Sequence, residues 1–144
     1  MEKIEIKNTD NLLQDAQQII ENAQKFAYRA VNVALIQRNW LLGKRILEEE
    51  LQGKERAELY GAEIVKRLSY ELTQIYGKGF TKSNLYQFID FYNAFPNIFQ
   101  TLSGKSFSLL SWSHYYTLLQ VKDPDARDWY MREAAEQTWS VRML

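Results

Sequence analysis

The feature that most constrains this fold is a run of about forty residues with almost no helix breaker. Between Asp10 and Leu51 there is no proline and one glycine, Gly43. Apolar residues recur there every three or four positions, the period of an α-helix, at Leu12, Leu13, Ala16, Ile19, Ile20, Ala23, Phe26, Ala27, Ala30, Val31, Ala34 and Trp40. We therefore expect one helix over residues 10–51, with Asp10 as its N-cap.

A helix of this length has consequences for the shape of the protein. About forty residues at about 1.5 Å per residue span about 60 Å, which exceeds the width of a domain of 144 residues. Either the helix bends near Gly43, or its first half leaves the body and packs on another chain. Residues 12–34 hold more apolar positions than one narrow stripe needs. We therefore expect a homodimer formed through this helix.

The rest of the sequence is also helical in pattern. Apolar spacing predicts helices over residues 57–76, 82–95, 111 or 113 to about 121, and 124 to about 137. A short helical turn is expected around residues 98–102, and a further element from residue 138. The residues suited to cap or open these helices are Thr81, Ser111 or Ser113, and Asp123 with Pro124.

These elements define the fold class and the domain organisation. We expect an all-α fold of five or six helices, with a flexible N-terminal tail at 1–10 and one helical domain at 11–144. The sequence stops at Leu144, inside an amphipathic pattern that begins at 138–140. We expect that a further domain follows.

Two of the helices form a helix-turn-helix-like pair. In the segment from Ala62 to Phe95, a four-residue turn at 77–80 joins two predicted helices. The two glycines of this turn permit positive φ angles. In DNA-binding proteins of this plan the second helix enters the major groove. Here Gln87 would suit adenine, and Lys82 would suit guanine or phosphate. Ordinary packing of two helices explains the same pattern.

Charge gives a second indication of nucleic-acid binding. The chain carries 18 basic and 18 acidic residues, so it has no overall positive charge. Residues 66–105 hold five basic and two acidic residues, a net charge of +3. Residues 1–23 hold two basic and five acidic residues, a net charge of −3. The candidate nucleic-acid-binding residues are Lys66, Arg67, Lys78, Lys82, Ser83, Tyr86 and Gln87. Binding to phosphates requires the basic ones to share a face.

The sequence offers no equipment for catalysis. There is no cysteine, and one histidine cannot build a metal site. A PD-(D/E)xK nuclease needs an Asp followed by Asp/Glu-x-Lys, and no such triplet follows Asp125. We expect no cofactor, no metal and no cleavage by this chain alone. No apolar run is long enough to cross a membrane, and the lack of cysteines fits a cytoplasmic protein.

The aromatic residues favour a structural role. For His114 we expect a cap by Ser113 and packing by Trp112 and Tyr116, rather than chemistry. The four tryptophans could stack on bases, but apolar stripes usually bury them, with Trp129 the best candidate for partial exposure. The core is expected where the second and third helices meet, with Leu72, Leu85, Phe88 and Tyr92 mostly buried.

Several short motifs resemble a known family. They are Trp40-Leu-Leu-Gly43, Arg56-Ala-Glu-Leu-Tyr-Gly61, Leu68-Ser69-Tyr-Glu-Leu72, Gly77-Lys-Gly79-Phe80, Asn84-Leu85, Phe91-Tyr92, Leu110-Ser-Trp-Ser-His114, Arg127-Asp-Trp-Tyr130 and Trp139-Ser-Val-Arg142. Together they resemble the N-terminal domain of the YhcG-like bacterial family, over roughly residues 25–144. Members resemble two-part proteins with a helical N-terminal part and a PD-(D/E)xK nuclease part after it.

The resemblance implies a role in targeting or assembly for an attached nuclease. We expect this domain to bind DNA or another nucleic acid. One alternative is a helical protein-interaction or dimerisation domain without nucleic-acid contact. Another is an independent regulator, similar to an antitoxin.

Overall fold

The computed structural model describes residues 4, 6–52, 59–98 and 110–144. All regular structure in these ranges is helical: α1 (Leu12–Gln52), α2 (Leu59–Tyr76), α3 (Lys82–Ala94), α6 (Trp112–Leu118) and α7 (Pro124–Glu136). The predicted all-α class and the long first helix are therefore confirmed. Residues 57 and 58, and the turn predicted at 98–102 apart from Ile98, lie outside the described residues.

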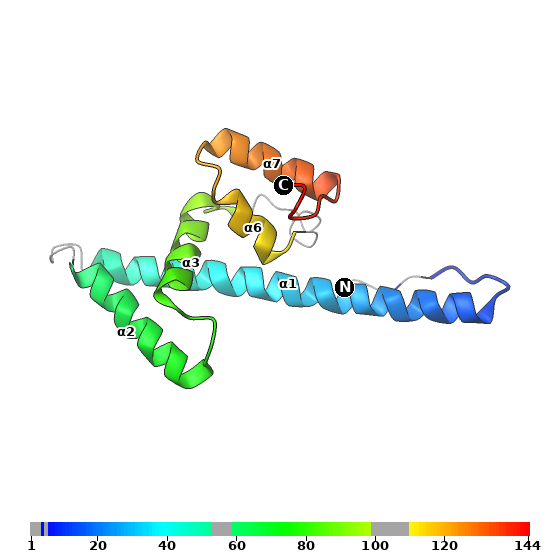
Figure 1. The fold of residues 1–144 in the computed structure, drawn as a ribbon, viewed down its shortest axis with the longest axis horizontal. Coiled ribbons are helices and arrows are strands. Elements are labelled where there is room, and N and C mark those ends of the chain that lie inside the picture. Colours follow the sequence, from blue (N-terminus) through cyan, green and yellow to red (C-terminus); the bar gives the residue numbers. More distant parts are fainter. Residues whose placement is uncertain (1–3, 5, 53–58, 99–109) are drawn as a thin grey trace.

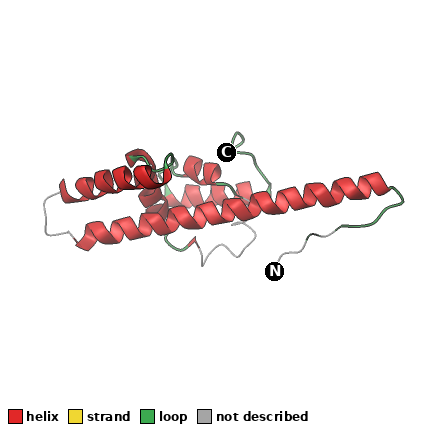
Figure 2. Cartoon of the chain, turned by 90° about the horizontal axis from the view of Figure 1, so that it is seen from below, coloured by secondary structure: helices red, strands yellow, loops and turns green. Residues whose placement is uncertain are grey.

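The first helix does not bend. α1 runs continuously for 41 residues, and its N-terminal half extends far beyond the other helices (Figure 1). The view turned by 90° shows the same projection (Figure 2). Of the two expected arrangements, the structure has the one in which the first half leaves the body.

The start of α1 is capped by Asn11 and not by Asp10. The Oδ1 atom of Asn11 accepts the backbone N–H of Gln14 at 3.0 Å, because Asn11 stands directly before the first helical residue. The tail is then fastened to the helix by Asp15. Its carboxylate accepts the backbone N–H of Thr9 at 3.0 Å and the Thr9 hydroxyl at 2.7 Å.

Gly43 has a packing role in place of the predicted bend. A Cβ atom at Gly43 would lie 2.0 Å from the carbonyl oxygen of Phe88 and 2.5 Å from its carbonyl carbon. The backbone of α3 therefore crosses α1 at this glycine, closer than any side chain would allow. A helix can carry glycine at such a crossing without a kink, since glycine adopts helical angles at a modest cost in stability.

The expected core was placed against the wrong helix. α3 packs mainly on α1 and much less on α2. Leu85 and Phe88 are buried as predicted, whereas Leu72 and Tyr92 are only half-buried. The reason is the crossing at Gly43, which brings Phe88 and Ile89 against Ile46 of α1. Periodicity shows which face of a helix is buried but not which partner buries it.

A second cluster joins α1 to α3, α6 and α7 around Phe91 and Tyr115. The indole N–H of Trp40 donates to the carbonyl oxygen of Phe95 at 3.0 Å, which ties α1 to the end of α3. Tyr115 is fully buried, its hydroxyl has no hydrogen-bond partner among the described residues, and burial raises the pKa of that hydroxyl. Tyr115, and not Tyr116, is therefore the packing residue of α6.

The short helix α6 begins at a capping box that includes His114. Ser111, and not Ser113, is the N-cap, because its backbone N–H donates to His114 Nδ1 at 3.1 Å while its side chain accepts the N–H of His114. His114 Nε2 lies 2.8 Å from the carbonyl oxygen of Trp139. Since Nδ1 accepts, Nε2 carries the proton and donates to Trp139. His114 therefore links α6 to the C-terminal segment, a contact that the sequence did not predict.

In the C-terminal part, the start of α7 agrees with the prediction from the sequence. Asp123 caps α7 and Pro124 occupies its first turn, as predicted. The further element expected from residue 138 is a single turn, in which Ser140 accepts the N–H groups of Met143 and Leu144. Within the described ranges, no helix combines the length and apolar character that crossing a membrane requires.

Candidate nucleic-acid interface

The turn between α2 and α3 is fixed by its two glycines and by hydrogen bonds from side chains of α2 and α3. Gly77 and Gly79 adopt positive φ angles of 84° and 109°, which glycine reaches without strain. The Ser69 hydroxyl donates to the carbonyl oxygen of Phe80 at 2.7 Å. The side chain of Asn84 donates to the carbonyl oxygen of Gly79 at 3.1 Å. We call residues 77–82 the basic turn.

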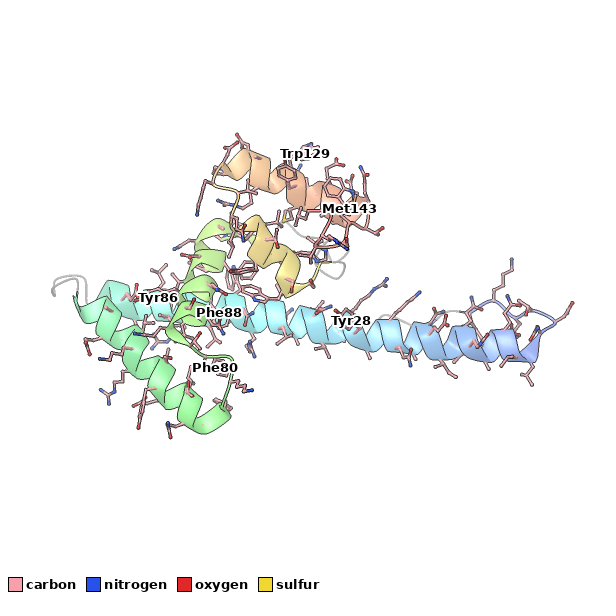
Figure 3. The ribbon with its side chains drawn as sticks, in the orientation of Figure 1. Tyr28, Phe80, Tyr86, Phe88, Trp129 and Met143 are labelled. Carbon is pink, nitrogen blue, oxygen red and sulfur yellow. The ribbon has the colours of Figure 1, made fainter. Side chains whose placement is uncertain are left out.

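Phe80 anchors the basic turn to the long helix. Its ring lies 5.9 Å from the ring of Tyr76 and 5.4 Å from the guanidinium carbon of Arg38 on α1. The same guanidinium lies 5.9 Å from the Phe88 ring and donates to the buried Asn39 side chain at 2.8 Å. Figure 3 shows Phe80 in the loop between α2 and α3, below Phe88.

Arg38 is a cation of this region that the sequence did not reveal. It stands about forty positions before the basic turn, and no motif connects the two. Burial lowers the pKa of its guanidinium, which stays protonated at neutral pH. Among the described residues it has no carboxylate partner.

The basic turn carries positive charge without compensation. Lys78 and Lys82 are exposed, and within the described part of the chain neither forms an ion pair. Lys82 is the first residue of α3, whose first turn contains no acidic residue. A helix N-terminus bears a partial positive charge, so Lys82 is unfavourably placed unless an anion binds there. Phosphate is an anion that helix N-termini bind readily.

The outer face of α3 begins with polar residues. Ser83 and Tyr86 are exposed and Gln87 is half-buried, and in the described ranges their side chains form no hydrogen bond. One turn further along, Asp90 is exposed and lines an open cleft of about 400 Å³ with Asn93, Lys122 and Arg127. The negative charge of Asp90 makes the surface beyond the first two turns of α3 unfavourable for an anion.

Lys66 and Arg67 lie on α2 in different surroundings. Lys66 is exposed and stands ten residues, about 15 Å of helix, before Tyr76 at the end of α2. Arg67 is paired with Glu71 at 3.3 Å. It also lines a groove with Glu49 and Glu63 of α1 and α2. The positive charge of Arg67 is therefore offset locally, unlike that of Lys78 and Lys82.

The tryptophans differ in exposure, and the described acidic residues do not form a metal-binding group. Trp40 is buried, while Trp129 is 53% exposed, as predicted, and its ring contacts that of Tyr130 at 5.0 Å. Across the described residues there is no group of three histidine or carboxylate side chains close enough to hold a metal ion.

Comparison with known proteins adds to this geometry. Residues 15–144 match the family described as DUF1016 N-terminal domain. The chain belongs to that family. A protein of Escherichia coli (strain K12) named "Putative nuclease YhcG" is 35% identical to this chain over an alignment that covers 88% of the chain. No solved structure matches the chain.

The DUF1016 N-terminal domain accounts for only part of that relative. The chain spans 40% of the length of the Escherichia coli protein. The match confirms the family that the sequence motifs indicated, and it associates the domain with a nuclease.

Proposed function

We propose that this domain targets and assembles a nuclease by binding nucleic acid through the basic turn and the start of α3. The observation that carries the proposal is the positive charge of Lys78 and Lys82 at a helix N-terminus without a carboxylate partner in the described residues. Such a site suits the phosphate backbone. Ser83, Tyr86 and Gln87 would contact sugar, phosphate or base edges, and Arg38 would add charge behind Phe80.

The assembly part of the proposal rests on α1. Its N-terminal half carries an apolar stripe made of Leu12, Leu13, Ala16, Ile19, Ile20, Ala23, Phe26, Ala27 and Ala30. Leu12 and Leu13 are 84% and 67% exposed. Exposed apolar surface of this extent marks an interaction site in soluble proteins. A nuclease part would follow the helical domain, as the resemblance to the YhcG-like family implies.

The second candidate is a protein-interaction domain that does not contact nucleic acid. The placement of Arg67 favours it, because Glu49, Glu63 and Glu71 surround that residue. The zero net charge favours it as well, since long-range attraction to nucleic acid is then small. If this candidate is correct, the apolar stripe alone carries the function.

A binding experiment separates the two candidates. We expect weak binding to labelled duplex or single-stranded DNA at low salt, with log K falling against log salt at a slope of about −2 to −4 for two to four phosphate contacts. The double variant Lys78→Glu with Lys82→Glu should lose this binding, because two attractive charges become repulsive. Fluorescence anisotropy titrations at several salt concentrations measure the salt slope and the loss of binding in the double variant.

The matched control is Lys66→Glu with Arg67→Glu, which makes the same charge change on α2. Both double variants alter exposed residues, so circular dichroism should show unchanged helix content. If the α2 variant abolishes binding and the turn variant does not, the interface lies on α2. If the unaltered chain fails to bind either DNA at low salt, the protein-interaction candidate replaces our proposal.

We also expect that the chain cleaves no DNA. Metal-dependent cleavage needs carboxylates that hold the ion, and the described residues contain no such group. Supercoiled plasmid incubated with Mg²⁺ or Mn²⁺ should remain intact. Cleavage activity that co-purifies with the chain on two unrelated columns would contradict the assignment of catalysis to another part of the protein.

A further inference from the structure

The apolar stripe of α1 has the spacing of a helix that pairs with another helix. Three large residues, Leu12, Ile19 and Phe26, are seven positions apart. Alanines repeat with the same period at Ala16, Ala23 and Ala30. A seven-residue repeat keeps the same side of two helices in contact over several turns. The alanine column lies in the middle of the stripe, because Leu13, Ile20 and Ala27 form a third column on its other side.

The edges of the stripe are charged on one side only. One edge carries Asp15 and Arg29, fourteen positions apart, and the other carries Gln17, Gln24 and Val31. A two-fold axis brings equal edges together in an antiparallel pair and opposite edges together in a parallel pair. The antiparallel pair alone therefore places Asp15 near Arg29 of the second copy, twice per dimer.

Both charges are available for this contact. Arg29 is exposed and has no ion pair within the described residues. The carboxylate of Asp15 binds the N–H and hydroxyl of Thr9. Its two oxygens have room for about four hydrogen bonds, so a guanidinium can bind in addition. Asp15, Ala16 and Ala23 are half-buried in the single chain, whereas Leu12, Leu13 and Ile20 are more than half exposed.

We propose that two copies of this chain pair through the N-terminal halves of α1 in antiparallel orientation, centred near residue 22, with Asp15 of each copy against Arg29 of the other. This inference rests on the proposed assembly function and specifies its geometry. The helical bodies then lie at opposite ends of the paired helices, because the body begins on the C-terminal side of the stripe (Figure 1).

A distance measurement tests the orientation. The chain contains no cysteine, so Gln37→Cys introduces a single site for a spin label. Residue 37 lies fifteen positions from the centre of the pair, and two labels should be about 45 Å apart along the helix axes. A parallel pair would bring the labels within about 20 Å, since paired helix axes are about 10 Å apart. Pulsed electron paramagnetic resonance resolves these values.

A charge reversal tests the contact itself. Arg29→Asp should weaken dimerisation about tenfold at low salt, because two attractions become repulsions. Adding Asp15→Arg to the same chain should restore it. Residues 15 and 29 are about 21 Å apart on one helix, so only contact between copies explains the recovery. Lys25→Asp makes the same charge change on the side of α1 away from the stripe and should alter dimerisation less than about threefold.

The outcomes of sedimentation and labelling are distinct. A chain that is monomeric at about 100 µM overturns the assembly proposal as well as the orientation. A dimer with the short label distance, or one without recovery in the double reversal, overturns the antiparallel pair and leaves assembly intact. A dimer with the long distance and with recovery supports both.

Discussion

Replacing Gly43 with alanine is expected to destabilise the domain by about 3 kcal/mol, near the upper end of the usual cost of overpacking. The added Cβ atom would lie 2.0 Å from the Phe88 carbonyl oxygen. Backbone atoms cannot move aside as a flexible side chain can, so α3 must shift from α1 as a whole. Midpoints and slopes of urea unfolding curves measure the change in the free energy of unfolding.

The sign of this effect makes it diagnostic. Alanine in place of glycine inside an exposed helix normally stabilises by about 1 kcal/mol. Gly61 on α2 is the matched control, because the nearest described atom to a Cβ there belongs to the flexible Glu50 side chain at 3.5 Å, an ordinary contact. Gly61→Ala should therefore stabilise the domain. A Gly43→Ala variant that is as stable as the unaltered chain would show that α3 does not cross α1 at this position.

Truncating Phe88 to alanine is expected to cost about 3–5 kcal/mol, the range for a large buried aromatic side chain. Phe88 is 3% exposed, packs with Ile46, Val65, Leu85 and Ile89, and its ring meets that of Trp112 at 5.7 Å. The change would leave a cavity at the contact of α1, α2 and α3. The same unfolding experiment gives the loss.

Tyr86→Ala on the outer face of α3 provides the comparison. Tyr86 is 42% exposed and belongs to neither core cluster, so its loss should cost less than about 1 kcal/mol. Equal losses for Phe88→Ala and Tyr86→Ala would mean that α3 is rotated about its axis relative to the structure. Because α3 presents the proposed interface, that rotation would also displace Ser83 and Gln87.

Local chemistry made much of the fold predictable from the sequence. The absence of proline before Pro96, together with apolar spacing, predicted α1 within two residues at each end. Gly77 and Gly79 predicted the positive φ angles of the turn, and Thr81 predicted the start of α3. Each of these features depends on residues that are neighbours in the chain.

Features that depend on distant residues were not predictable in the same way. A glycine in a helix indicates either a bend or the close approach of another backbone. Only the position of Phe88 shows that Gly43 allows α3 to approach α1 closely. The exposed lysines of the turn were identified, whereas Arg38 joins them only because α1 passes beside Phe80. By sequence, Ser111 and Ser113 are equally suited to cap α6. In the structure Ser111 is the cap, and His114 also contacts Trp139, a residue distant in the sequence.

The continuity of α1 couples its two halves in helical phase. The same helix carries the apolar stripe and, from Ile36 onward, the buried residues against which α3 is fixed. Each residue added between these parts would rotate the stripe by about 100° around the helix axis and move it by about 1.5 Å. An insertion of seven residues would nearly preserve the phase, whereas one of two would turn the stripe to the other side. Sequence length between residues 30 and 36 should therefore vary among relatives only in steps that preserve this phase.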